Sequence, residues 1–269
     1  MSLVHRLLRK PFFGRFEVPW RMPDGEKVGI WQRVPIPSTT GVSLIGLLAE
    51  AEVDPVGTVV LAHPMGKAAK GFWLRYGHAE LFRRAGLHVL VFDFNGFGES
   101  PPASFDYPSD ALAAGRFAQA RFPSQPVGLV GASFGAGWGM CSMAREGSPY
   151  RAAVLEGLFP TLPDFWKHYP VAHAFLRASQ FVWPSAERRM RPELEATRLI
   201  GRPDVLLVYG DADRFTPPAH GERMLRAMQG CANAELCVLP NVEHTFAYRD
   251  QPETYAARVV PFLRNSLSS

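Results

Sequence analysis

The stretch GASFG places Ser133 between Gly131 and Gly135, directly after the apolar run Pro126–Val130. A serine hydroxyl can act as a nucleophile when a tight turn between a strand and a helix makes it project. Glycines suit such a turn because any side chain there would collide with the neighbouring strand or helix. In a chain with 24 glycines one GxSxG match is weak evidence, so a base and an acid must be found elsewhere.

A candidate base and candidate acids follow later in the chain. The stretch VLLVYGDADRFTPP carries Asp211 and Asp213 after one apolar run, and CVLPNVEHTF carries His244 after the next. Of the other seven histidines, His220 lies in a helix-like stretch and the rest precede the acid. A histidine that takes the serine proton, oriented by a carboxylate, would complete the apparatus of acyl transfer.

The elbow GASFG, the acid loop GDADRFTP and the histidine loop NVEHTF, in this order, resemble the α/β-hydrolase superfamily, in its serine esterase, dienelactone-hydrolase-like or thioesterase-like branches. The resemblance covers about residues 28–267, one insertion excepted. It implies that Ser133 is the nucleophile, His244 the base and Asp213, rather than Asp211, the acid. Glu156 stays open as an alternative acid, because some members of the superfamily place the acid after that strand.

The oxyanion formed by attack on a carbonyl needs preorganised N–H donors. The resemblance implies that one is the amide of Phe134 and that the other comes from the loop LAHPMGKAAKGFW. Similar hydrolases carry His-Gly where this chain has His63 and Pro64, and proline has no N–H to donate. We therefore predict the amide of Met65 as the second donor, with Gly66 allowing close approach.

Short apolar runs alternate with helix-like stretches along most of the chain. This alternation predicts an α/β fold with a mainly parallel sheet covered by helices on both faces, and the resemblance implies eight strands. The first two runs are close enough in sequence to pair antiparallel. The predicted strands lie within residues 28–36, 42–50, 57–63, 88–94, 126–132, 152–157, 204–210 and 234–240.

Four helices follow from their start and stop signals. Residues 71–86 end on Gly86, residues 109–122 open with Ser109 as a cap, and residues 217–230 end on Gly230. The last helix, over 252–267, is predicted to kink or break near Pro261. In DFNGFGESPP we interpret Ser100 as a turn residue rather than a second nucleophile.

The segment 161–198 is too long for a simple connection and is rich in aromatic residues, so we predict a helical lid. The alternative is a surface extension without substrate contact. Residues 1–27 would form a leader, and 28–160 with 199–269 the hydrolase core. The predicted substrate contacts, in the lid and beside the oxyanion loop, are His63, Trp73, Phe159, Trp166 and Trp183.

These residues predict a serine hydrolase that cleaves a carboxylic ester with an apolar acyl or alkyl group, without metal or organic cofactor. A thioesterase or an acyltransferase would use the same residues. A serine nucleophile argues against the haloalkane dehalogenases and epoxide hydrolases of the superfamily. A non-catalytic ligand-binding protein on the same scaffold is the less favoured alternative, because the triad is intact.

Composition also limits the partners and the cellular compartment that we expect. The net charge of +4 comes from scattered arginines without a nucleic-acid-binding motif, so we expect no nucleic acid partner. Three cysteines without a CxxC pair favour a reduced, cytoplasmic setting, and no apolar stretch reaches the roughly 20 residues of a membrane span. The start MSLVHRLLRKPFF could form a short amphipathic helix, but we favour a leader packed on its own domain over membrane contact. The sequence leaves the oligomeric state open.

Overall fold

The computed structural model describes residues 20–25, 27–65, 69–182 and 184–268. Most of the predicted leader, and with it the predicted amphipathic helix, lies outside the described residues. The same holds for Gly66 and Trp183.

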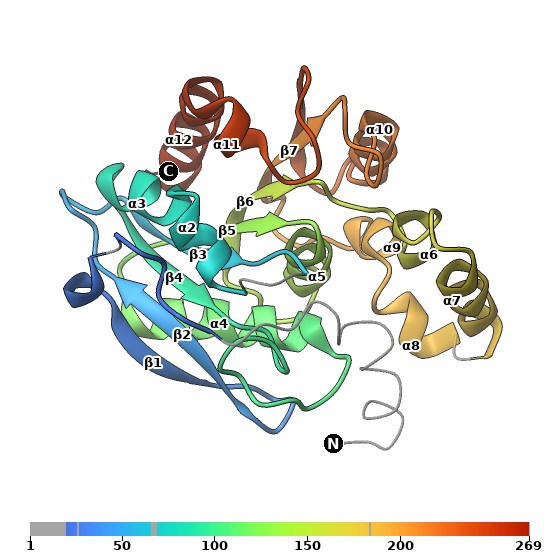
Figure 1. Ribbon diagram of the computed structural model, residues 1–269, viewed down its shortest axis with the longest axis horizontal. Helices are drawn as coiled ribbons and strands as arrows, with labels where there is room; N and C mark the ends of the chain where they lie inside the picture. The colour runs from blue at the N-terminus through green and yellow to red at the C-terminus, as the bar shows by residue number, and fades with distance from the viewer. Residues whose placement is uncertain (1–19, 26, 66–68, 183, 269) are drawn as a thin grey trace.

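The described strands form one eight-stranded sheet in the order β1-β2-β4-β3-β5-β6-β7-β8 (Figure 1). β2 pairs antiparallel with β1 and β4, and all other neighbours are parallel. The predicted mainly parallel sheet is thereby confirmed. The strands are β1 (Gln32–Pro37), β2 (Ser43–Ala49), β3 (Gly57–Ala62), β4 (Leu87–Phe92), β5 (Val127–Ala132), β6 (Tyr150–Glu156), β7 (Asp204–Gly210) and β8 (Asn233–Leu239).

Helices cover both faces of the sheet, and every residue of β3, β4 and β5 is therefore buried. One face packs against α4 (Tyr107–Arg121), α5 (Phe134–Met143) and α10 (Pro218–Ala227). The other face packs against α2 (Gly71–Arg75), α3 (His78–Arg84), α11 (Ala247–Asp250) and α12 (Pro252–Ser268). The two apolar clusters fix the sheet, and the carboxyl ends of its parallel strands meet at one edge.

Three helix predictions need correction. The helix predicted over 71–86 is two helices, because Gly77 adopts φ +79° between α2 and α3. α4 begins before Ser109, whose hydroxyl instead donates to Asp106 at 2.7 Å inside the first turn. α12 is not broken at Pro261. Proline has no N–H for the carbonyl of Ala257, four residues earlier, but Ala257 is exposed, so water can bond to that carbonyl.

The segment between β6 and β7 is helical, with α6 (Leu162–Phe165), α7 (Pro170–Val182), α8 (Pro184–Arg188) and α9 (Pro192–Ala196). In Figure 1 these helices lie to the right of the sheet, beyond α5. α9 belongs to the core packing, since Ala196 is fully buried in the cluster that contains α5. None of the helices that the structure describes combines the length and apolarity that a bilayer crossing requires.

Candidate active site

Ser133 lies at the turn between β5 and α5 with φ +50° and ψ −111°. A positive φ is rare for a residue with a side chain and stores strain, which the surrounding structure must hold in place. Two backbone bonds do so: the N–H of Ser133 donates to the carbonyl of Glu156 at 2.8 Å, and its own carbonyl accepts from Gly137 at 2.9 Å. The turn presents the hydroxyl to a cavity while the residue as a whole is only 3% exposed.

Each of the two glycines that flank Ser133 is required by a different steric contact. A Cβ on Gly135 would lie 1.9 Å from the carbonyl oxygen of Ala62, at the end of β3. A Cβ on Gly131 would lie 2.7 Å from the carbonyl oxygen of Gly135. Both contacts are with backbone atoms that cannot move aside, so the elbow and the close approach of α5 to β3 require glycine at both positions.

Three predicted residues from separate loops meet at this turn. The hydroxyl of Ser133 donates to Nε2 of His244 at 2.7 Å, and Nδ1 of His244 donates to Oδ2 of Asp213 at 2.6 Å. Asp213 follows β7 and His244 follows β8, whose carboxyl ends lie at the same edge as that of β5. This is the geometry in which a histidine can accept the serine proton while a carboxylate holds its tautomer.

The carboxylate of Asp213 is held by several donors. Its Oδ1 accepts the N–H groups of Phe215 at 2.8 Å and Thr216 at 3.0 Å, and its Oδ2 accepts the Thr216 hydroxyl at 2.5 Å. Burial would raise the pKa of Asp213, but the hydrogen bonds from His244 and Thr216 outweigh it and hold that pKa below its ordinary value. Asp213 is thus an ionised partner for an imidazolium.

The two alternative acids make their hydrogen bonds elsewhere. Asp211 accepts the N–H of Asn241 at 2.6 Å and so connects two loops. Glu156 accepts the N–H of Ala247 at 2.9 Å, three residues beyond His244. Burial raises the pKa of Glu156 to about 7. Glu156 therefore supports the site by its backbone and side chain, joining the loop of Ser133 to that of His244.

The two residues predicted to donate to the oxyanion are found near Ser133 by different criteria. Phe134 is the first residue of α5, directly after Ser133. Met65 lines the same cavity as Ser133 and His244. An oxyanion hole needs two amides that point at the developing charge, so the pair Phe134 and Met65 stays a prediction.

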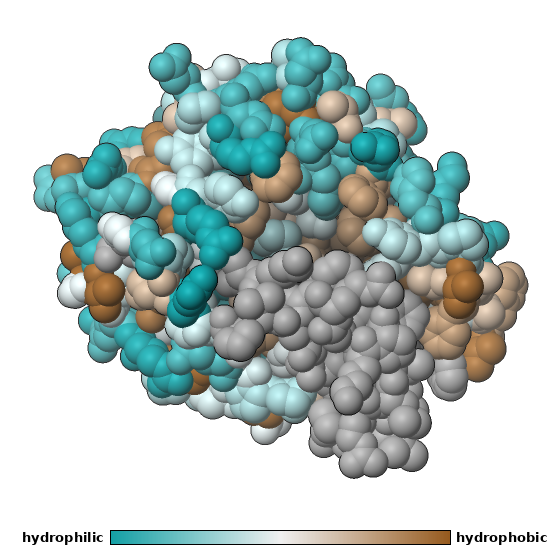
Figure 2. Space-filling view, viewed as in Figure 1, coloured by the Kyte–Doolittle hydropathy of each residue, from teal (hydrophilic) through white to brown (hydrophobic). Residues whose placement is uncertain are grey.

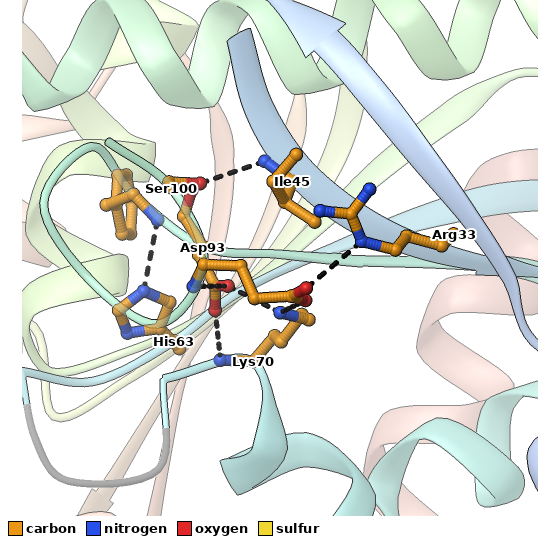
Figure 3. Close-up of polar contacts among 8 residues, drawn as sticks. Arg33, Ile45, His63, Lys70, Asp93 and Ser100 are labelled. Carbon is orange, nitrogen blue, oxygen red and sulfur yellow. Dashed lines mark hydrogen bonds and ion pairs between the residues drawn. The ribbon is translucent and has the colours of Figure 1, made fainter. Parts of the chain in front are cut away.

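A buried ion pair connects the end of the Met65 loop to the end of β4 (Figure 3). Lys70 and Asp93 are both fully buried, and Asp93 accepts the Lys70 ammonium at 2.5 Å and the Lys70 N–H at 2.9 Å. The ammonium also donates to Glu99 at 2.7 Å. Such closely paired buried charges hold one geometry, because separating them would leave a charge without water.

Other side chains in Figure 3 complete this junction. Nε2 of His63 accepts the N–H of Phe94 at 3.2 Å, while its Nδ1 donates to the carbonyl of Pro64 at 2.8 Å. Burial lowers the pKa of His63, which keeps the ring neutral for these roles. Ser100 donates to the Asp93 carbonyl and accepts from Ile45, both at 2.8 Å, as its interpretation as a turn residue requires.

Ser133 opens onto a cavity of about 370 Å³ whose walls are rich in aromatic side chains. Within the described part of the chain, Arg75 is the lining residue that carries a permanent charge. The described lining residues are Pro64, Met65, Ala69, Phe72, Arg75, Tyr76, Ser133, Phe165, Trp166, Tyr169, Phe215, His244, Thr245 and Phe246.

The predicted substrate contacts need correction against this lining. Trp166 lines the cavity, and Trp183 lies outside the described residues. His63, Trp73 and Phe159 do not line it, because each is buried behind the wall: Trp73 packs on His78 beneath Phe72, and Phe159 packs on Trp138.

Sequence reasoning missed several wall residues. Phe215 and Phe246 each stand two residues after a triad member, so their spacing from Asp213 and His244 was the available signal.

No group of three or more His, Cys, Asp or Glu side chains that could hold a metal occurs among the described residues.

Comparisons with known proteins agree with the fold. A model of the alpha/beta hydrolase family matches residues 59–258. Human Protein ABHD12B is 26% identical over 218 residues, covering 76% of this chain and 59% of the relative. The lysophosphatidylserine lipase ABHD12 of Danio rerio is 25% identical over 175 residues, covering 60% of this chain and 44% of the relative. The chain thus spans less than two thirds of the length of either relative.

Solved structures show the same fold. The Pyrococcus furiosus esterase Pf2001 superposes with a TM-score of 0.74 at 17% identity, covering 93% of this chain and 96% of that one. The acylaminoacyl peptidase of Pyrococcus horikoshii superposes with a TM-score of 0.67 at 12% identity, covering 89% and 42%. From the family match, and with a fold and an elbow that agree with it, the chain belongs to the alpha/beta hydrolase family.

Proposed function

We propose that the protein is a serine hydrolase that cleaves carboxylic esters with an apolar acyl or alkyl group. The observation that carries the proposal is the single histidine, His244, hydrogen-bonded to Ser133 on one ring nitrogen and to Asp213 on the other. A strained elbow serine in this arrangement has few structural reasons to exist, since the strain must be offset elsewhere in the fold.

The geometry supports a two-step reaction. His244 takes the proton of Ser133 as Oγ attacks the carbonyl carbon, and the amides of Phe134 and Met65 receive the resulting oxyanion. The tetrahedral adduct collapses, His244 protonates the departing alcohol, and an acyl-enzyme forms. Water, deprotonated by His244, then attacks the acyl group and releases the acid and Ser133.

The cavity supports an apolar substrate. Its wall presents Phe72, Phe165, Trp166 and Phe246, which would bury an acyl chain and exclude water from the oxyanion. The names of the relatives agree with ester chemistry: one is a lysophosphatidylserine lipase and one fold neighbour an esterase. Because Arg75 lines the same cavity, esters with an anionic alcohol group belong among the substrates to test.

A fluorophosphonate probe tests the nucleophile. We expect the protein to be labelled at Ser133, and Ser133→Ala to remain folded and unlabelled, with Ser104→Ala as a matched control that labels normally. Labelling that persists in Ser133→Ala would refute the assignment. A panel of esters, matched thioesters and acyl acceptors then separates ester hydrolysis from the thioesterase and acyltransferase alternatives.

A further inference from the structure

The helix α7 presents its apolar face to solvent. Val171 is 86% exposed, Phe181 82% and Val182 61%, and Phe175 lies on the same face by helical spacing. Surface helices of globular proteins normally direct such a face to the core. Figure 2 shows the hydrophobic surface over this segment, at the right of the view.

The polar side chains of α7 hold the helix in this orientation. His173 donates through Nδ1 to the carbonyl of Pro163 at 2.9 Å, and Gln180 donates to Glu187 at 3.0 Å. Both partners lie in the flanking helices α6 and α8. Rotating α7 to bury its apolar face would break both bonds, so the outward apolar face is built into the segment.

Two cationic side chains flank this face. Lys167 and Arg177 are exposed and lie before and within α7. The acidic side chains of the segment are paired instead: Asp164 with Arg223 at 3.0 Å, and Glu187 with Arg191 at 2.6 Å. An apolar face bordered by lysine and arginine is the pattern of a helix that lies in the interface of an anionic lipid surface.

The same segment borders the cavity of the nucleophile. Tyr169, directly before α7, lines the cavity and is also 41% exposed, and its ring contacts that of Trp166 with centroids 5.3 Å apart. A surface that covers α7 therefore lies next to a residue of the cavity wall.

We propose that α7 docks its apolar face on an anionic lipid surface and holds the cavity mouth against it. A lipid ester could then pass from that surface to Ser133; this second step rests on the proposed function, whereas docking does not. A second copy of the chain is a weaker candidate for the occupant. A helix of 13 residues is about 20 Å long and about 10 Å wide, so one face of it covers about 200 Å². A stable interface between two proteins buries roughly 800 Å² on each partner.

Co-sedimentation with vesicles tests the docking. The full chain carrying Ser133→Ala is mixed with vesicles of phosphatidylcholine alone or of phosphatidylcholine with phosphatidylserine, so hydrolysis cannot alter the lipid. We expect stronger binding to the anionic vesicles. The pair Val171→Ser and Phe181→Ser should lower the partition coefficient about tenfold or more, because the apolar face is lost. Arg177→Gln should lower only the preference for anionic lipid.

Ile200→Ser is the matched control, because Ile200 is 73% exposed but lies outside α7. It should leave vesicle binding unchanged. Absence of binding, or an equal loss in the control, would overturn the proposal. So would light scattering that shows a dimer which the α7 variants convert to a monomer. Hydrolysis of a soluble short-chain ester by the same variants with Ser133 restored should stay at the wild-type rate, so a failure of the proposed function is detected separately. Unchanged melting temperatures ensure that the variants compared are folded.

Discussion

His244 can act as the base in only one tautomer, with the proton on Nδ1 facing Asp213 and Nε2 facing Ser133. A carboxylate only accepts hydrogen bonds, so Asp213 selects this tautomer, whereas an amide could donate and select the other. At the scale of single residues, the tautomer of His244 thus depends on residue 213 presenting a carboxylate oxygen to Nδ1.

Asp213→Asn is therefore expected to lower kcat about 10⁴-fold, as the loss of the correct tautomer does in serine proteases. Steady-state hydrolysis of a soluble ester measures it. Asp211→Asn is the matched control and should act mainly on stability, because Asp211 accepts from Asn241 rather than from the base. The reverse ranking of the two variants would reassign the acid.

Glu156 makes stability depend on pH. Its pKa rises from 4.5 to about 7 on folding, so between these values the folded protein keeps a proton that the unfolded chain has released. The free energy of unfolding should thus fall as pH rises through this window, by roughly 3 kcal/mol. Glu156→Gln keeps an oxygen for the Ala247 N–H and should remove this loss, so its advantage over wild type grows from pH 5 to pH 8.

Urea unfolding at the two pH values measures the difference. Parallel profiles for wild type and Glu156→Gln would mean that Glu156 ionises normally in the folded protein. Its surroundings include Asp213 and Asp250, whose charges also raise this pKa.

At the scale of elements, the loop that carries Met65 is held from both ends by the turn after β4. His63 accepts from Phe94 where the loop begins, and Lys70 pairs with Asp93 where it ends. The position of Met65, the predicted second oxyanion donor, thus depends on an adjacent strand rather than on the loop alone.

Lys70→Met should destabilise the fold by about 3 kcal/mol, because it leaves Asp93 buried without its counter-ion. The double variant Lys70→Met with Asp93→Asn should be less destabilised than the sum of the two single variants. Thermal or urea unfolding of the four proteins gives the coupling. Additive effects would show that the pair does not hold the junction.

The helical segment between β6 and β7 supplies Phe165, Trp166 and Tyr169 to the cavity wall. If this wall receives an acyl chain, kcat/KM should rise with chain length, by about 0.8 kcal/mol of binding per buried methylene. Trp166→Ala should flatten that slope and leave acetate esters nearly unchanged. Equal losses for short and long esters would mean that Trp166 supports the fold instead.

At the scale of the whole molecule, one edge of the sheet assembles the site. The turns after β3, β4, β5, β7 and β8 meet there because parallel strands end together (Figure 1). The chain therefore brings residues 133 and 244, which are 111 positions apart, to 2.7 Å without any local interaction between them.

Much of the fold and of the candidate site could be predicted from the sequence, because the signals for strands and turns are local. The runs that became β3 and β5 are apolar apart from Thr58, and the glycines around Ser133 mark a turn that other residues cannot adopt. The corrections are also local in cause. Gly77, with its positive φ, divides the helix predicted after β3, and the hydroxyl of Ser109 bonds to Asp106 inside the first turn of α4 rather than capping the helix.

The sequence by itself determined the strands, the elbow and the order of the proposed nucleophile, acid and base, because periodicity, glycine spacing and chain order are properties of the chain alone. Only the tertiary structure decided which aromatic side chains face the cavity: Phe72 lines it while its neighbour Trp73 is buried behind it. It also decided that burial raises the pKa of Glu156 to about 7 and that α7 turns its apolar face outward. These properties depend on which distant residues surround a side chain, and no local pattern specifies that packing.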